Sequence, residues 1–136
     1  TAESVTGGKA ADFITSVSGA SKVYKGGFIV YLNEEKEKLL NIDKEIIEKY
    51  GAVSEEVCSE MLTGLSKKID TNIYIATTGV AGPEKDEKNN EVGTVYMGIS
   101  INGKKYIKKQ MFSGDREMIK YRAVRAVLAD LWKLVK

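Results

Sequence analysis

The chain has 136 residues, of which 43% are hydrophobic and 29% charged, a composition typical of a single globular domain. Lys and Arg number 21 against 19 Asp and Glu, so the net charge is only +2, and the basic surface of a nucleic-acid-binding protein is not expected. The absence of histidine excludes Ser-His-Asp triads, Cys-His pairs and His-ligated zinc. An enzyme with this composition must take its base from Lys, Asp, Glu or Tyr.

The single cysteine, Cys58, forbids an internal disulfide and predicts a reducing, cytoplasmic location. Its place in an apolar helical stripe predicts a core residue rather than a nucleophile. No apolar run approaches the roughly 18 residues of a membrane span, and no signal peptide opens the chain. The chain starts abruptly with an extended segment that leads straight into a helix, so we expect that the natural chain or its relatives carry sequence before Thr1.

The first half of the sequence predicts a helix, a strand and a second helix. The first helix is expected from Lys9 to about Val17, followed by a turn at residues 18–21. Residues 27–32 form an apolar run of β-branched and aromatic residues, which suits a buried strand. Asn33 is a candidate N-cap of the helix that follows, with two glutamates in its first turn.

Two more helices are expected before the next strand. One covers residues 42–50 and ends at Gly51. Ser54 caps the other, whose apolar residues recur three and four positions apart. These apolar positions are Val57, Cys58, Met61, Leu62, Leu65 and Ile69.

The second half predicts a strand, a hairpin and a long helix. Asn102-Gly103 is a strong hairpin signal between two alternating segments. The order of elements indicates a mixed sheet with helices on its faces, and we predict one α/β domain over residues 1–136. The remaining elements are a strand at 72–78, a charged loop at 84–91, hairpin strands at 93–101 and 104–112, and an amphipathic helix at 115–134.

Ser4 lies where the extended segment bends toward the first helix, followed by Thr6, Gly7 and Gly8. Glycines allow a ligand to approach the backbone, and N–H groups at such a bend can bind an anion or a developing oxyanion. A serine at this bend could be an exposed nucleophile. The alternative is that Ser4 or Thr6 only caps the helix.

Lys36 follows Asn33 by three residues, in the first turn of a helix. A cation at this position opposes the helix dipole, and a partly buried lysine there could be neutral near pH 7 and act as a base. The alternative is a solvated lysine in a charged stretch.

Two further segments have the features of binding loops. Residues 77–83 are a strand end followed by small residues, where ligands bind in open α/β sheets, although a plain tight loop would look the same. Asp115 is a natural cap of the last helix, and Arg116 beside it could bind a phosphate or lie free in solvent.

Taken together, these segments resemble the C-terminal domain of the competence/damage-inducible protein CinA, a family that includes stand-alone nicotinamide-nucleotide amidohydrolases. Ordered motifs spread over nearly the whole chain carry the resemblance. They are Ala2-Glu3-Ser4-x-Thr6-Gly7-Gly8, Ser18-Gly19-Ala20-Ser21, Gly26-Gly27-x-x-x-Tyr31-x-Asn33-Glu34-x-Lys36, Gly51-Ala52-Val53-Ser54, Thr78-Gly79-x-Ala81-Gly82-Pro83, Val92-Gly93-Thr94-Val95 and Phe112-x-Gly114-Asp115-Arg116.

The resemblance implies a three-layer α/β/α fold and hydrolysis of nicotinamide mononucleotide to nicotinate mononucleotide and ammonia, in pyridine-nucleotide recycling. It implies Ser4 as nucleophile, Lys36 as its base and Tyr31 near both. No cofactor or metal is expected, the partner is a small-molecule nucleotide rather than nucleic acid or membrane, and a homodimer is expected. The substrate-binding residues expected are Thr6, Gly7, Gly8, Thr78, Gly79, Ala81, Gly82 and Arg116.

The sequence departs from the family pattern in three places. Val5 stands where the family usually has Cys, and the charged segment 84–86 replaces a glycine-rich stretch. The helix and strand that usually precede Ala2 are not in the sequence. A second hypothesis is therefore a catalytically inactive nucleotide-binding or regulatory domain. Near-neutral charge and the lack of an aromatic-basic stripe argue against a role on DNA.

Overall fold

The computed structural model describes all residues from Thr1 to Lys136 and contains one five-stranded sheet. The spatial order of the strands is β2-β1-β3-β4-β5, so the first strand of the chain lies inside the sheet. The strands are β1 (Ala2–Glu3), β2 (Phe28–Ile29), β3 (Ile73–Gly79), β4 (Thr94–Ile101) and β5 (Lys104–Met111).

The sheet is mixed, as the sequence predicts. β1 is parallel to both of its neighbours, with Ala2 opposite Phe28 on β2 and opposite Ala76 on β3. β3, β4 and β5 are antiparallel in succession, and β4 and β5 form the hairpin around Asn102-Gly103. Because β1 and β3 run parallel, their carboxyl ends meet at the same edge of the sheet, where ligands bind in open α/β folds.

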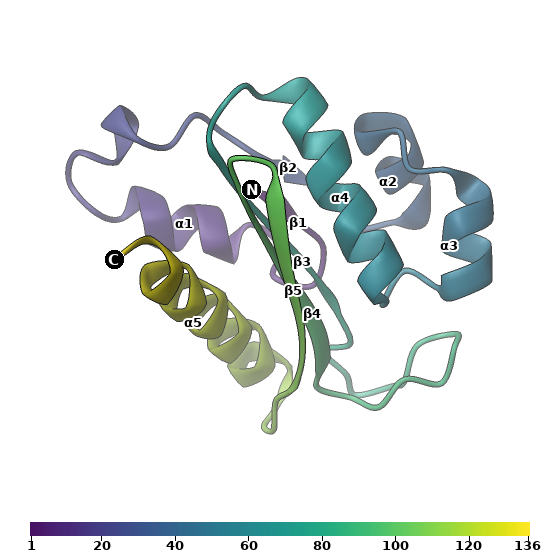
Figure 1. Ribbon diagram of the computed structural model, residues 1–136. Helices are drawn as coiled ribbons and strands as arrows, with labels where there is room; N and C mark the ends of the chain where they lie inside the picture. The colour runs from purple at the N-terminus through teal and green to yellow at the C-terminus, as the bar shows by residue number, and fades with distance from the viewer.

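The helices form a layer on each face of the sheet, which gives the three-layer α/β/α fold that the resemblance implies (Figure 1). α1 and α5 lie on one face, and α2, α3 and α4 lie on the other. A short 3-10 helix follows α1 at residues 20–22. The helices are α1 (Lys9–Thr15), α2 (Asn33–Leu40), α3 (Lys44–Tyr50), α4 (Glu55–Lys68) and α5 (Arg116–Val135).

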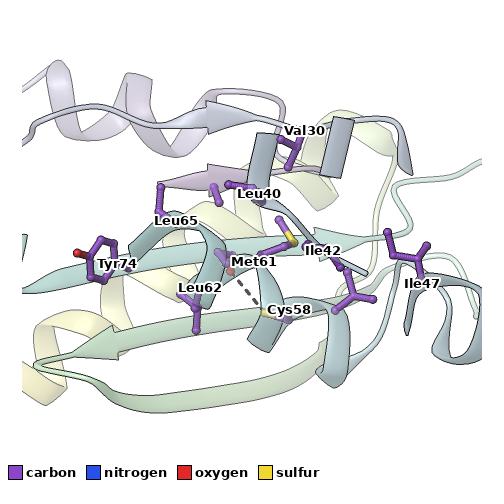
Figure 2. Packing of buried hydrophobic residues seen from close by; sticks show 12 residues of the cluster. Val30, Leu40, Ile42, Ile47, Cys58, Met61, Leu62, Leu65 and Tyr74 are labelled. Carbon is purple, nitrogen blue, oxygen red and sulfur yellow. Dashed lines mark hydrogen bonds between the residues drawn. The ribbon is translucent and has the colours of Figure 1, made fainter. Parts of the chain in front are cut away.

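Each helical layer buries its own hydrophobic cluster against the sheet. Figure 2 shows the cluster of 12 buried residues under α4, where Cys58, Met61 and Leu62 pack toward the strands. Cys58 is fully buried, which raises the pKa of its thiol to about 12 and confirms it as a core residue. The second cluster of nine residues lies under α5, around Ile119, Ala123 and Val127.

The helix starts predicted from short polar residues are largely confirmed. The side chain of Ser54 accepts a hydrogen bond from Val57 N and that of Asp115 from Met118 N, as predicted. Asp43, which was not predicted as a cap, accepts from Glu45 N at the start of α3. Asn33 is the exception, because it is the first residue of α2 and Leu32 holds the cap position without a side-chain hydrogen bond.

The prediction of a buried strand over residues 27–32 is wrong. β2 contains only two residues and forms an edge of the sheet. Ile29 is 55% exposed and Leu32 is 62% exposed, whereas Val30 is fully buried. An edge strand packs one face only, so Val30 and Phe28 pack in the core while Tyr31 from the same run lines the site described below.

Candidate active site

A cleft opens at the sheet edge where β1 and β3 end. Ser4 directly follows β1, Gly79 ends β3, and α2 contributes Lys36 after the neighbouring edge strand. The inner part of the cleft has a volume of about 140 Å³. It is lined by Ser4, Val5, Tyr31, Asn33, Lys36, Ala52, Val53, Thr78, Gly79, Ala81 and Arg116.

Ser4 and Lys36 are in direct contact at the bottom of this cleft. The Lys36 ammonium donates to Ser4 Oγ at 3.1 Å, to the Val30 carbonyl at 2.9 Å and to the Tyr31 carbonyl at 3.1 Å. Lys36 is only 1% exposed, and Ser4 is 7% exposed. The interpretation of Lys36 as a solvated lysine is therefore wrong.

Burial changes the acidity of Lys36. No carboxylate forms an ion pair with it, and desolvation lowers the pKa of its ammonium from 10.5 to about 8. When the amine is neutral it keeps two N–H groups and gains a lone pair. The two carbonyls can only accept, so they hold the two N–H groups and the lone pair is left for the Ser4 hydroxyl. The geometry thus favours proton transfer from Ser4 to Lys36.

Packing between helices α2 and α4 holds Lys36 in this position. Leu40, one turn further along α2, is 1% exposed and contacts α4 at Gly64. A Cβ at Gly64 would lie 2.8 Å from the Leu40 Cβ, so glycine is required for this close approach. Glu34 lies on the exposed side of α2, away from the buried ammonium.

Ser4 stands on a tight double turn between β1 and α1. Its N–H donates to the Thr77 carbonyl at 3.0 Å, and its carbonyl accepts from Gly7 N at 3.1 Å. Gly7 and Gly8 follow with φ of 59° and 104°, the left-handed region that glycine adopts without strain. The N–H of Val5 donates to no protein group, and in strand-to-helix elbows the residue after the nucleophile supplies an oxyanion donor.

The prediction that Ser4 or Thr6 caps α1 is wrong, because Glu3 takes this role. The cap position belongs to Gly8, which has no side chain to offer. Glu3 reaches forward instead, and its carboxylate accepts from Ala10 N at 2.8 Å and from Ala11 N at 3.0 Å. Thr6 Oγ1 donates to the same carboxylate at 2.6 Å and lies 2.7 Å from Thr77 Oγ1.

Tyr31 and Arg116 meet at the mouth of the cleft. The Arg116 guanidinium donates to the Tyr31 hydroxyl at 2.6 Å and to the Gly82 carbonyl at 2.5 Å. Tyr31 thus touches Lys36 only through its backbone carbonyl, and its hydroxyl is engaged with Arg116. Arg116 has five N–H groups, so three remain for a ligand.

A wider outer chamber of about 470 Å³ continues from the inner cleft past Tyr31 and Arg116. Its far wall is formed by residues 83–86 at the start of the 83–91 loop, in which Lys85 forms an ion pair with Glu91 at 2.9 Å. Asn90 anchors this loop through Asp86 Oδ2 at 2.8 Å and the Val53 carbonyl at 3.4 Å. The charged loop is therefore tied to the 51–54 segment that lines the inner cleft.

The structure brings most of the predicted site residues together. Thr78 also donates to the Ala52 carbonyl at 2.7 Å, which holds the 51–54 segment against β3. The cleft excludes Thr6, Gly7 and Gly8, since the Thr6 hydroxyl is spent on Glu3 and Thr77 and the two glycines line neither chamber. The predicted residues that line the inner chamber are Ser4, Tyr31, Lys36, Thr78, Gly79, Ala81 and Arg116, with Gly82 in the outer one.

Sequence reasoning missed Glu3, which is 1% exposed and has no cationic partner within ion-pair distance. A carboxylate two residues into a strand that the sheet encloses was the available signal, because buried carboxylates always need donors. It also missed Val53, which lines the inner chamber from a loop far away in the sequence.

None of the helices is long and apolar enough to cross a membrane. No group of three or more His, Cys, Asp or Glu side chains is placed to hold a metal ion.

Comparison with known proteins gives the family. The model of the CinA C-terminal domain matches residues 1–135. A CinA-like protein of Petrotoga mobilis is 43% identical over 135 residues, covering 99% of this chain and 34% of that protein. A CinA-like protein of Kosmotoga olearia is 46% identical over 128 residues, covering 94% of this chain and 31% of that protein. The chain therefore spans about a third of the length of these curated relatives.

Solved structures agree with the sequence relatives. A CinA superfamily protein from Escherichia coli superposes with a TM-score of 0.96 at 39% identity, covering 98% of this chain and 78% of that one. A competence or damage-inducible protein from Enterobacter asburiae superposes with a TM-score of 0.96 at 32% identity, covering 99% of this chain and 85% of that one. The α/β/α fold with a cleft at its mixed sheet is thus that of a known domain class. The chain belongs to the CinA C-terminal domain family.

Proposed function

We propose that this domain hydrolyses the carboxamide of nicotinamide mononucleotide to nicotinate mononucleotide and ammonia. One observation carries the proposal: a buried lysine without a carboxylate partner contacts a serine hydroxyl at 3.1 Å at the bottom of a cleft. In a chain without histidine, a Ser-Lys pair is a suitable way to activate a hydroxyl for attack on an amide. The resemblance of the motifs to the nicotinamide-nucleotide amidohydrolases supplies the substrate.

In the first half of the reaction Ser4 Oγ attacks the carboxamide carbon while neutral Lys36 takes the hydroxyl proton. The carbonyl oxygen becomes an oxyanion, and the free N–H of Val5 is a candidate donor to it. The C–N bond then breaks as Lys36 returns the proton to the leaving nitrogen. Ammonia departs, and the nicotinoyl group remains as an ester on Ser4.

In the second half a water molecule attacks the ester carbon, and Lys36 accepts its proton. Collapse of the intermediate breaks the bond to Ser4 Oγ, which regains its proton from Lys36. The product is the carboxylic acid of the nucleotide, ionised at neutral pH. Lys36 is thus the only base required in both halves, consistent with its pKa of about 8.

The two chambers suit the two ends of the proposed substrate. The inner chamber is small and its lining mixes apolar side chains with Ser4 and Lys36, which fits a flat pyridine carboxamide. Arg116 stands at the junction with the wider chamber and keeps free N–H groups, which fits a ribose phosphate.

The test is release of ammonia from nicotinamide mononucleotide by the purified protein and by Ser4→Ala. We expect turnover in the wild type and a loss of several orders of magnitude in the variant, with substrate binding retained. A protein that is stabilised thermally by the nucleotide but releases no ammonia would instead be the inactive nucleotide-binding domain. Full activity in Ser4→Ala would refute the role of the serine.

A further inference from the structure

We propose that Glu3 is a positioning residue for the nucleophile, acting with Thr6 and Thr77 as a buried hydrogen-bonded clamp beneath the Ser4 turn. The inference rests on the proposed function, because it assigns Glu3 a part in setting the geometry of the attack by Ser4. It gives the Thr6 side chain a role other than contact with substrate.

The hydrogen bonds of Glu3 are unusual for a buried carboxylate. They come from three neutral donors, Ala10 N at 2.8 Å, Ala11 N at 3.0 Å and Thr6 Oγ1 at 2.6 Å. With Glu3 at 1% exposure and no lysine or arginine within 4.0 Å, these donors replace its hydration shell. Two of these donors make the carboxylate the cap of α1, and the third, the Thr6 hydroxyl, ties this cap to the turn that carries Ser4.

The number of available protons determines which group donates in each hydrogen bond of the clamp. A carboxylate accepts only, so the single hydroxyl proton of Thr6 goes to Glu3. The contact of 2.7 Å between Thr6 Oγ1 and Thr77 Oγ1 therefore has Thr77 as its donor. The chain runs from Thr77 on β3 through Thr6 to Glu3 on β1 and ends on the first N–H groups of α1. All three side chains are at most 1% exposed.

This clamp holds Ser4 from two sides. Thr77 accepts the Ser4 N–H through its carbonyl at 3.0 Å and donates to Thr6 through its hydroxyl. Glu3 directly precedes Ser4 in the chain, and its carboxylate binds the first N–H groups of α1, the helix that follows the turn. The segment between these anchors carries Ser4 Oγ and the free N–H of Val5, the two groups that must face the same carbonyl carbon and oxygen. A displacement of about 1 Å in such a group can cost about a hundredfold in rate.

The clamp acts by geometry and leaves the acidity of the base unchanged. Burial lowers the pKa of Lys36, and the Lys36 ammonium contacts Ser4 and two backbone carbonyls rather than the Glu3 carboxylate. Removing that charge should leave the midpoint of the pH profile in place. A lower kcat with an unchanged pH midpoint and an unchanged KM distinguishes a positioning residue from a residue that tunes the base or binds substrate.

The experiment compares Glu3→Gln, Thr6→Val and Thr6→Ser. Gln keeps one acceptor oxygen but places an amide NH2 donor against the donors that face the Glu3 carboxylate, and Val removes the Thr6 hydroxyl that joins Thr77 to Glu3. We expect kcat for nicotinamide mononucleotide to fall ten- to a hundredfold in both, with KM and the pH midpoint near the wild-type values. Thr6→Ser keeps the hydroxyl and should retain kcat within about threefold.

Val127→Ala is the matched control, because Val127 lies on the buried face of α5, is fully buried and lines neither chamber. It should lower the melting temperature but keep kcat. If kcat falls in Val127→Ala as much as in Glu3→Gln at equal loss of stability, or if Glu3→Gln and Thr6→Val keep full kcat, the inference is overturned.

A second readout does not depend on the natural substrate. A fluorophosphonate forms a P–O bond with an activated serine while fluoride leaves and the serine proton passes to the base. Slower labelling of Ser4 in Glu3→Gln than in Val127→Ala supports the clamp even if nicotinamide mononucleotide is not turned over, in which case only the proposed function fails. Equal labelling rates, or no labelling of Ser4 in the wild type, would overturn the clamp.

Discussion

The two chambers of the cleft differ in how they hold their charged groups. In the inner chamber Lys36 is buried, faces only neutral oxygens and has a lowered pKa. In the outer chamber Arg116 is exposed, and Lys85 forms an ion pair with Glu91. A desolvated cation gives up its proton more easily and can act as a base, whereas a solvated guanidinium stays charged and can bind an anion.

The two chambers also differ in the interactions that hold their walls in place. The inner one rests on main-chain bonds of β1 and β3 and on the packing of α2 against α4. The outer one rests on side chains from a charged loop and on the contact of Arg116 with Tyr31. The difference predicts that changes in the inner chamber affect the chemical step, while changes in the outer chamber affect substrate affinity.

The largest effect is expected for Lys36→Met, which fills the site but removes the base. The loss in kcat should match that of Ser4→Ala, several orders of magnitude, because the two groups act as a unit. Single-turnover ammonia release from the double variant should be little lower than from either single variant. Losses that multiply in the double variant would contradict a shared step.

The next largest effect is expected for Arg116→Ala, which tests the role of the outer chamber in substrate affinity. Arg116→Ala should raise KM for nicotinamide mononucleotide about ten- to a hundredfold, the worth of a charge-assisted hydrogen bond to phosphate. The phosphate-free riboside should be affected only slightly, because it lacks the group that Arg116 binds. Steady-state kinetics on both substrates measure the contrast, and equal damage to both would make Arg116 a structural residue.

A smaller effect is expected for the pH dependence of kcat/KM, which reports on Lys36 in the inner chamber. Because Lys36 must be neutral to act, kcat/KM should rise with pH and level off above about pH 8, with about a tenth of the plateau at pH 7. A flat profile, with chemistry shown to be rate-limiting, would exclude Lys36 as the base.

The same titration should appear in the stability of the fold. Lys36 binds its proton more weakly in the folded state than in the unfolded state, so its contribution to the free energy of unfolding should rise between about pH 8 and pH 10.5. The Cys58 thiol, with its pKa raised by burial from 9.0 to about 12, acts in the opposite direction above pH 9. The rise from Lys36 is on the order of 3 kcal/mol, from about 1.4 kcal/mol for each unit of pKa difference. The difference in the free energy of urea unfolding between the wild type and Lys36→Met, measured across this pH range, would show the Lys36 contribution, because the Cys58 contribution is common to both proteins.

The smallest effect is expected for Tyr31→Phe. The hydroxyl contacts Arg116 at 2.6 Å, and the Lys36 ammonium contacts only the backbone carbonyl of this residue. Removing the hydroxyl should raise KM a few-fold and leave kcat nearly unchanged. A large fall in kcat would instead place the Tyr31 hydroxyl in the proton transfer.

Short-range patterns in the sequence were enough to predict most of the fold. The caps at Ser54 and Asp115 and the turn at Asn102-Gly103 involve residues within a few positions of each other. The apolar stripe of α4 likewise depends only on helical spacing. Interactions of this kind are decided locally, so the residues that form them also reveal them.

The contacts of the site itself were decided by tertiary structure. Motifs named Ser4 and Lys36 as a candidate pair, but they lie 32 positions apart and meet because β1 lies parallel to β2 in the sheet. Whether Lys36 is solvated or buried, and whether Glu3 or Thr6 ties the first helix, depends on which strand is enclosed and which forms an edge. That choice follows from packing the whole chain, because burial is a property of all the neighbours of a residue and not of its own sequence context.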